Sequence, residues 1–280
     1  MRYTVVQKCP ACNGNALMPK FKRGDGLPVA KCGQCELLVL YKYPQNITDV
    51  YDTAYFDKNR DSSVDIGYSD YLKAVSPLDF VRHLAVVEAA RLAIQKPRRL
   101  LLDVGAASGD FLALAHLFGW GNTQGVEPVP YARTMARRLG VIEQYATVED
   151  IPSDCYFDFI TAWELIEHLP DLNSFMRTMR SHLGTGGVFL CSTPDADQSL
   201  FYPRPEEWIG FHVSLEHLSY FTSASLHRLL TQFFPYVQVW TSATGTFFIS
   251  FSAWAFRRSR ARRSLNRFAR FAVQALRLGG

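Results

Sequence analysis

The fold is most clearly encoded in Leu100-Leu-Leu-Asp103-Val-Gly105-Ala-Ala-Ser-Gly109-Asp-Phe-Leu112. Residues 99–104 form an apolar run with the length of a buried strand, and a helical pattern begins near Asp110. Between them lies a glycine loop, which lets the backbone approach a ligand closely, while the N-terminus of the helix favours anionic groups. The stretch therefore predicts a strand–loop–helix unit that binds a nucleotide-like ligand.

Apolar runs and helical patterns alternate on both sides of this unit. The runs occupy 99–104, 123–127, 157–163 and 187–193, and the helical patterns occupy 77–95, 110–118, 130–139 and 171–183. Two more apolar runs, 236–241 and 246–254, flank turn residues and predict a hairpin that closes the sheet. This alternation indicates an α/β fold with a doubly wound, Rossmann-like sheet.

A second acidic residue, Glu127, ends the next apolar run after the glycine loop. A carboxylate at that position can accept both ribose hydroxyls of an adenosyl group. The loop departs from the dinucleotide pattern G-x-G-x-x-G, and no phosphate-binding lysine follows it. These departures disfavour NAD and a P-loop nucleotide.

The chain here resembles the class I S-adenosylmethionine-dependent methyltransferases. The matching motifs, in order, are 103–109, 125–128, 148–150, 157–164 and 184–188. The resemblance covers about residues 75–255 and implies a seven-stranded sheet whose last strand is antiparallel. It also implies that the methionine moiety lies near Gly105, the ribose on Glu127 and the adenine near Asp150. The cofactor-binding residues expected on this basis are Asp103, Gly105, Ala106, Ala107, Gly109, Phe111, Glu127, Pro128, Asp150, Ile151, Ala162 and Trp163.

Four of the six cysteines form two C-x2-C pairs, Cys9/Cys12 and Cys32/Cys35. Each pair can direct two thiolates at one ion about 2.3 Å away, and two pairs complete a tetrahedron. Because sulfur fills all four positions, none remains for a substrate. We therefore expect a structural Zn²⁺, which a segment of this size needs in order to fold.

These features divide the chain into four segments. A zinc ribbon is expected at 1–42, a Tyr-rich connector or cap at 43–75, the methyltransferase domain at 76–256 and a basic amphipathic tail at 257–280. A ribbon followed by a Tyr-rich stretch resembles bacterial methyltransferases of sugar, glycan and natural-product metabolism. Those tyrosines either cap the cofactor pocket or pack the ribbon against the domain.

The residues after the third strand, Glu164-Leu-Ile-Glu167-His168, carry the candidate catalytic groups. In a helical turn, two carboxylates and an imidazole would share one face. His168 could then serve as a general base for a substrate hydroxyl. Alternatively, Glu164, Glu167, His168 and His217 could hold a divalent cation such as Mg²⁺ that lowers the pKa of that hydroxyl. The pattern resembles the metal-binding turn of 3-demethylubiquinone-type O-methyltransferases and of small-RNA 2′-O-methyltransferases; a purely structural role is the third interpretation.

A long loop, 194–222, follows the fourth strand at the edge of the sheet where substrates bind. It ends in Glu216-His217-Leu-Ser-Tyr-Phe-Thr222, which resembles the family's H-L-x-x-F-T/S element beside the active site. Thr222 or Ser223 is expected to cap the following helix. His217 is therefore a further catalytic candidate.

The formal net charge of +4 conceals an asymmetry. Nine arginines and no acidic residue follow Glu216, so residues 1–216 carry a net charge of −5. Apolar and basic residues separate on a helical wheel of 257–278, which is typical of a helix on an anionic membrane surface. Packing on the domain and binding of RNA are the other interpretations. No secretory signal begins the chain, so we expect a cytoplasmic protein, held at the inner membrane surface if the tail is interfacial.

The sequence thus predicts an enzyme that transfers a methyl group from S-adenosylmethionine to a hydroxyl of a small molecule, sugar or glycoconjugate. Absence of an S/D/N-P-P-Y motif favours O-methylation over N-methylation of bases. An RNA methyltransferase of the rRNA type is the first alternative, motivated by the ribbon and the Arg-rich tail. A non-catalytic scaffold that binds S-adenosylmethionine is the second.

Overall fold

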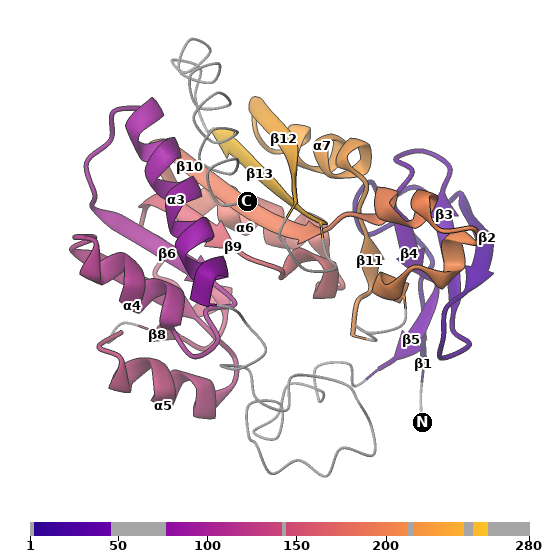
Figure 1. Cartoon of the computed structure of the whole chain (residues 1–280), viewed down its shortest axis with the longest axis horizontal. Helices are drawn as coiled ribbons and strands as arrows, with labels where there is room; N and C mark the ends of the chain where they lie inside the picture. The colour runs from indigo at the N-terminus through magenta and orange to yellow at the C-terminus, as the bar shows by residue number, and fades with distance from the viewer. Residues whose placement is uncertain (1–2, 46–76, 142–143, 212–215, 244–248, 257–280) are drawn as a thin grey trace.

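The computed structural model describes residues 3–45, 77–141, 144–211, 216–243 and 249–256 (Figure 1). Residues 46–75 of the predicted Tyr-rich cap and the whole basic tail lie outside these residues. A seven-stranded sheet forms the centre of the molecule, in the order β12-β13-β10-β9-β6-β7-β8. Its strands are β6 (Leu100–Val104), β7 (Asn122–Val126), β8 (Gln144–Tyr145), β9 (Phe157–Ala162), β10 (Leu183–Pro194), β12 (Tyr236–Ala243) and β13 (Ile249–Phe256).

The sheet topology confirms the predicted methyltransferase-type α/β fold. Strands β10, β9, β6, β7 and β8 are parallel, whereas β13 runs antiparallel to both β10 and β12. The expected closing hairpin is the β12–β13 pair. Strand β6 lies inside the sheet and is buried on both faces, which explains why apolar and polar residues do not alternate along it.

Helices cover both faces of the sheet. One core joins the sheet to α3 (Pro77–Ala93), α4 (Asp110–Leu117) and α5 (Pro130–Arg138). The other joins it to α6 (Leu172–His182) and α7 (Ser223–Thr231). Helix α7 begins where expected, because the Thr222 hydroxyl accepts a hydrogen bond from the Ser225 amide at 3.1 Å.

The ribbon shares a sheet with the methyltransferase domain. Its strands are β1 (Tyr3–Val5), β2 (Leu17–Lys22), β3 (Pro28–Cys32), β4 (Leu38–Leu40) and β5 (Lys42–Pro44), so strand structure continues just past the expected boundary at residue 42. A fourth strand completes the β2-β3-β4 sheet: β11 (Ser219–Tyr220), which belongs to the long loop of the domain (Figure 1). The two segments that the sequence separates are therefore joined by backbone hydrogen bonds.

The long loop between β10 and α7 contains short 3-10 turns, η4 (Ala196–Phe201), η5 (Pro205–Glu207) and η6 (Ile209–Phe211). Its buried rings, Trp208, Phe211 and Tyr220, pack with Val29 and Leu40 of the ribbon in a third core. The loop thus serves as the interface between the domain and the ribbon. None of the helices in the described residues is both long and apolar enough to cross a membrane.

Candidate functional site

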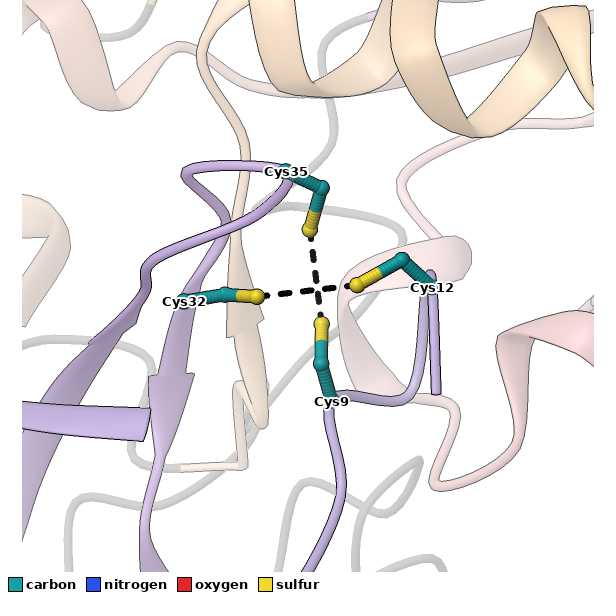
Figure 2. A group of neighbouring side chains, drawn as sticks. All are labelled: Cys9, Cys12, Cys32 and Cys35. Atoms are coloured by element: carbon teal, nitrogen blue, oxygen red, sulfur yellow. Dashed lines mark hydrogen bonds between the residues drawn. The ribbon is translucent and has the colours of Figure 1, made fainter. Parts of the chain in front are cut away.

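Four cysteine thiols converge at one end of the ribbon (Figure 2). The Sγ atoms of Cys9 and Cys35 are 3.4 Å apart and those of Cys12 and Cys32 are 3.6 Å apart. All four sulfurs lie within 4.8 Å of one another. A tetrahedral ion with bonds of about 2.3 Å needs sulfur–sulfur distances of about 3.8 Å. The geometry and the donor set therefore fit the predicted zinc.

The cysteine knuckles dock directly on the methyltransferase domain. Asn173 Nδ2 of α6 donates to the Pro10 carbonyl at 2.6 Å, and Gln232 Nε2 donates to that of Ala11 at 3.1 Å. Arg228 Nη1 donates to the Cys35 carbonyl at 3.1 Å. Three side chains of the domain thus hold backbone atoms of the ribbon beside its cysteines.

The glycine loop has the backbone that its sequence predicts. Gly105 and Gly109 adopt φ of 78° and 82°, in the left-handed region that favours glycine. A Cβ on Gly109 would lie 2.6 Å from Cβ of Ala136 in α5. Gly109 therefore serves close packing as well as turn geometry.

Glu127 lies at the end of β7 and is 6% exposed. Its carboxylate accepts hydrogen bonds from the Ala107 amide at 3.0 Å and the Val129 amide at 2.9 Å. Burial raises the pKa of Glu127, and the hydrogen bonds from the two amides act in the opposite direction. The carboxylate that the sequence assigns to the ribose thus also ties the glycine loop to β7.

Asp103 is the last residue but one of β6, where the Thr161 hydroxyl donates to its Oδ1 at 2.6 Å. Burial and the nearby charge of Glu127 raise the pKa of Asp103 to about 7, against the hydrogen bond from Thr161. Ala106 is buried in the loop beside it. Strand pairing thus places the two predicted carboxylates at the carboxyl edge of neighbouring strands.

Aromatic rings lie beside the loop. Trp163 follows β9 directly. Its ring packs edge-on against that of Phe111, with 5.8 Å between the ring centroids. The imidazole of His83 in α3 stacks on the Trp163 ring, with 4.2 Å between the ring centroids and an angle of 1° between the ring planes. Burial and the charge of Arg82 lower the pKa of His83 to about 3, so this imidazole is neutral. The Trp163 indole N–H is buried and has no hydrogen-bond partner among the described residues.

The expected adenine side is formed by η2 (Val148–Asp150). Asp150 accepts from the backbone N–H of Thr147 at 2.8 Å in a capping box, so its carboxylate shapes this turn. Ile151 and Ala162 are buried in the core, whereas Pro128 is exposed. Their contacts with a cofactor remain predictions.

The turn after β9 differs from the expected helical turn. Glu164 adopts φ of 47°, and the 3-10 helix η3 begins only at Ile166 and ends at His168. Glu164 is exposed and lies outside the group that Glu167, His168 and His217 form. The expectation that both carboxylates and the imidazole share one helical face is therefore wrong, because the left-handed φ of Glu164 keeps it outside the 3-10 helix that carries Glu167 and His168.

Glu167, His168 and His217 form a buried cluster at the carboxyl edge of the sheet. Glu167 Oε1 is 4.0 Å from His168 Nε2 and 3.9 Å from His217 Nε2. The two imidazole rings pack edge-on, with 4.6 Å between their centroids. Glu167 is 1% exposed, and neither of its oxygens has a hydrogen bond of normal geometry from a described residue, although the Thr193 hydroxyl is close. A buried carboxylate in this state is costly unless a ligand satisfies it.

Burial sets the charge states of this cluster. It lowers the pKa of His168 to about 4 and that of His217 well below its ordinary value, and the charge of Arg23 adds to the shift at His217. Burial and the carboxylate of Glu164 raise the pKa of Glu167. Both imidazoles therefore present a lone pair, as a metal ion or a hydroxyl proton requires.

Sequence reasoning did not find several residues of this region. Arg23 and His83 come from the ribbon and from α3, far from the motifs in sequence. Thr193 and Glu216 are buried beside the cluster, each with an oxygen that no described residue hydrogen-bonds. Glu216 could have been found, because it precedes the predicted residue His217 in the sequence. Arg23 could not, because no motif in the ribbon sequence marks a single arginine as part of the site.

A cavity of about 200 Å³ separates the ribbon from the residues that follow the two histidines. Val5, Val39 and Tyr43 line it from the ribbon, and Leu169 and Leu218 line it from the domain. The cavity is therefore lined by the residues that directly follow His168 and His217.

A family profile described as "Methyltransferase domain" matches residues 80–233, more than half of the chain. The chain belongs to this methyltransferase family. The match includes the glycine loop, Glu127, the Glu167/His168/His217 cluster and α7, and it leaves the ribbon outside. The expected class I S-adenosylmethionine-dependent methyltransferase fold is thereby confirmed.

Curated relatives of the methyltransferase match over a limited segment. The ubiquinone biosynthesis O-methyltransferase of Paramagnetospirillum magneticum is 34% identical over 98 residues, which cover 33% of this chain and 39% of the relative. The enzyme of the same name from Actinobacillus pleuropneumoniae serotype 7 is 33% identical over 105 residues, covering 33% and 44%. The matched segment thus spans less than half of either relative.

Solved structures resemble the methyltransferase over a larger part of its length. The plantazolicin methyltransferase BpumL, in complex with a pentazolic desmethylPZN analog and SAH, has a TM-score of 0.59 at 14% identity and covers 78% of this chain and all of its own. The N-methyltransferase NodS of Bradyrhizobium japonicum, in complex with S-adenosyl-L-homocysteine, has a TM-score of 0.50 at 15% identity, covering 74% of this chain and all of its own. At these identities the likeness concerns the fold.

The residues present fit an S-adenosylmethionine cofactor. Gly105 has a left-handed φ and little room for a Cβ, which would lie 3.1 Å from the Leu165 side chain, and the Glu127 carboxylate lies at the end of the neighbouring strand. The unpartnered N–H of Trp163 offers a buried donor at the end of β9. These groups match the ribose and amino-acid parts of such a cofactor.

Proposed function

We propose that the protein transfers a methyl group from S-adenosylmethionine to a hydroxyl of a small molecule, such as a phenol, a sugar or a glycoconjugate. The observation that carries this proposal is the buried Glu167/His168/His217 cluster, which follows β9, the strand paired with β6. Two neutral imidazoles and an unpartnered carboxylate suit deprotonation of a hydroxyl, which must lose its proton before it attacks a methyl group. The name shared by the curated relatives, which are O-methyltransferases, supports the same reaction.

The chain's own residues would hold and align the cofactor. Gly105 and Gly109 allow the loop to approach the methionine moiety, Glu127 accepts from the ribose, and Trp163 closes the pocket beside Phe111. When bound, the cofactor supplies an electrophilic methyl group on a sulfonium. Alignment and exclusion of water contribute most of the acceleration, so these positioning residues carry much of the rate.

We further propose that Glu167, His168 and His217 bind a divalent cation that lowers the pKa of the acceptor hydroxyl. Two imidazoles and one carboxylate form a donor set that suits Mn²⁺, Fe²⁺, Co²⁺ or Zn²⁺ better than the Mg²⁺ expected from the sequence. Glu164, which is exposed and lies outside this group, is available to contact the acceptor. The ribbon cysteines are proposed to hold a separate, structural Zn²⁺.

Methyl transfer from labelled S-adenosylmethionine tests this function. Catechol is the hydroxyl probe, and 1,2-phenylenediamine is the matched amine probe. We expect Mn²⁺-stimulated transfer to catechol that is lost in Glu167→Gln and retained in the surface control Asp154→Asn. Transfer to the diamine alone would contradict O-methylation, and undiminished transfer in Glu167→Gln would contradict the role of the cluster.

A further inference from the structure

The segment that carries His217 is held between the ribbon and the catalytic turn. The Leu218 amide donates to the Glu167 carbonyl at 2.8 Å, and the Leu40 amide of the ribbon donates to the Leu218 carbonyl at 2.8 Å. The next two residues form β11 and pair antiparallel with β4 of the ribbon. The backbone beside His217 thus contacts Glu167 on one side and the ribbon on the other.

A buried arginine of the ribbon strengthens this connection. Arg23 is 4% exposed, and its Nη1 donates to the His217 carbonyl at 3.1 Å and to the Tyr220 hydroxyl at 2.9 Å. Its Nε and Nη2 form a two-pronged ion pair with Asp25, at 2.9 Å and 2.7 Å. Asp25 in turn accepts from the Leu27 amide at 3.1 Å, so the turn between β2 and β3 fixes the carboxylate.

We propose that Arg23 is a positioning residue of the active site, which sets the orientation of the His217 imidazole through the backbone of His217. This proposal deepens the function proposed above and rests on His217 acting in it. The geometry supports it because one planar guanidinium bridges a fixed carboxylate and the carbonyl of the catalytic candidate. Charge-assisted hydrogen bonds of this kind are short, directional and about twice as strong as neutral ones.

Lysine cannot reproduce this arrangement. A compact ammonium can reach Asp25 or the His217 carbonyl, but it lacks the rigid fork that holds both at fixed angles. Arg23 is also nearly inaccessible to solvent, so its charge interacts with buried groups rather than with water. The ribbon, which the zinc-binding cysteines stabilise, therefore supplies part of the catalytic centre.

The test compares four variants of the full-length, zinc-loaded chain: Arg23→Gln, Arg23→Lys, Tyr220→Phe and the control Arg98→Gln. Arg98 pairs with Glu88 beside the N-terminal end of β6, at the opposite edge of the sheet from His217. Ring signals of ¹⁵N-labelled histidine report the environment of His217 without metal or substrate, and His217→Gln assigns them. Calorimetry with S-adenosylhomocysteine and transfer to catechol complete the set.

We expect the His217 ring signal to move in Arg23→Gln, with a smaller effect in Arg23→Lys and none in Arg98→Gln. The rate constant kcat should fall about 10- to 100-fold in Arg23→Gln, as when supporting residues around metal ligands are replaced. Affinity for S-adenosylhomocysteine should remain within about twofold, because Arg23 acts on His217 and Tyr220 rather than on the glycine loop. Tyr220→Phe keeps the bond to the His217 carbonyl and should behave like the wild type.

An unmoved His217 signal in a folded Arg23→Gln chain would overturn the proposal, even if the wild type transfers methyl groups to catechol. An equal effect of Tyr220→Phe would overturn the role of the carbonyl contact. If the wild type methylates no hydroxyl but the His217 signal still moves in Arg23→Gln, the positioning role stands and the proposed function fails.

Discussion

Replacement of Gly109 by alanine gives the sharpest test of the glycine loop, because the chain contains a matched control. Gly109 and Gly140 have nearly the same backbone conformation, with φ of 82° and 88°. A Cβ on Gly109 would lie 2.6 Å from Cβ of Ala136, whereas one on Gly140 would meet nothing within 4 Å. The two substitutions therefore share the conformational cost and differ in the steric one.

The expected free-energy changes follow from these two costs. A non-glycine residue in the left-handed region loses about 1–2 kcal/mol, which is the expected destabilisation by Gly140→Ala. Overpacking of a tight contact adds about 1–3 kcal/mol, because backbone atoms of α5 must move. We therefore expect Gly109→Ala to lower the free energy of unfolding by about 2–5 kcal/mol in total.

Urea unfolding followed by circular dichroism measures the difference, and calorimetry with S-adenosylhomocysteine measures its functional consequence. Separation of Gly109 from Ala136 displaces the start of α4, so the affinity of Gly109→Ala should fall at least tenfold. Gly140→Ala should bind normally. Equal destabilisation by the two substitutions would refute the steric argument, and normal binding by Gly109→Ala would refute the placement of the cofactor at this loop.

Three further predictions concern the other groups. Glu127→Ala should reduce S-adenosylhomocysteine affinity at least tenfold, and Glu127→Gln, which keeps one acceptor oxygen, should reduce it less; calorimetry would contradict the ribose assignment if both bind like the wild type. Glu167→Gln should abolish Mn²⁺ binding, measured by electron paramagnetic resonance, without loss of S-adenosylhomocysteine binding; retained Mn²⁺ would place the ion elsewhere. Removal of zinc with a chelator, or Cys35→Ser, should lower the melting temperature by several degrees, since the ribbon core depends on the ion; an unchanged melting curve in zinc-free protein would exclude a structural role for the metal.

Local patterns were sufficient to predict the central sheet and its helices. Four of the five residues of 100–104 are apolar because the strand is buried on both faces, and the helix at 172–182 packs one apolar face on the core. The helix at 77–93 has no single apolar face, since Leu78, Val81 and Leu92 are exposed. The cysteine spacing predicted the convergence of four thiols, because the zinc-binding turn is itself a local structure. The adjacent positions of Glu167 and His168 likewise marked them as one site.

The sequence could not predict the left-handed backbone conformation of Glu164. A pattern of residues three and four apart indicates a shared face only if the segment is helical, and the left-handed φ of Glu164 removes that premise. The sequence also could not show that β11 belongs to the ribbon sheet. Such pairing joins residues about 180 positions apart, and no local periodicity encodes its register.

What the sequence by itself determined is therefore the family, the glycine loop and the grouping of four cysteines, since each depends on residue types at short, fixed spacings. Tertiary structure alone decided that His217 meets Glu167 and His168, and that Arg23 reaches the carbonyl of His217 from the ribbon. The physical reason is that these contacts depend on how two sheets pack. Packing is set by the sum of many distant side chains rather than by any single motif.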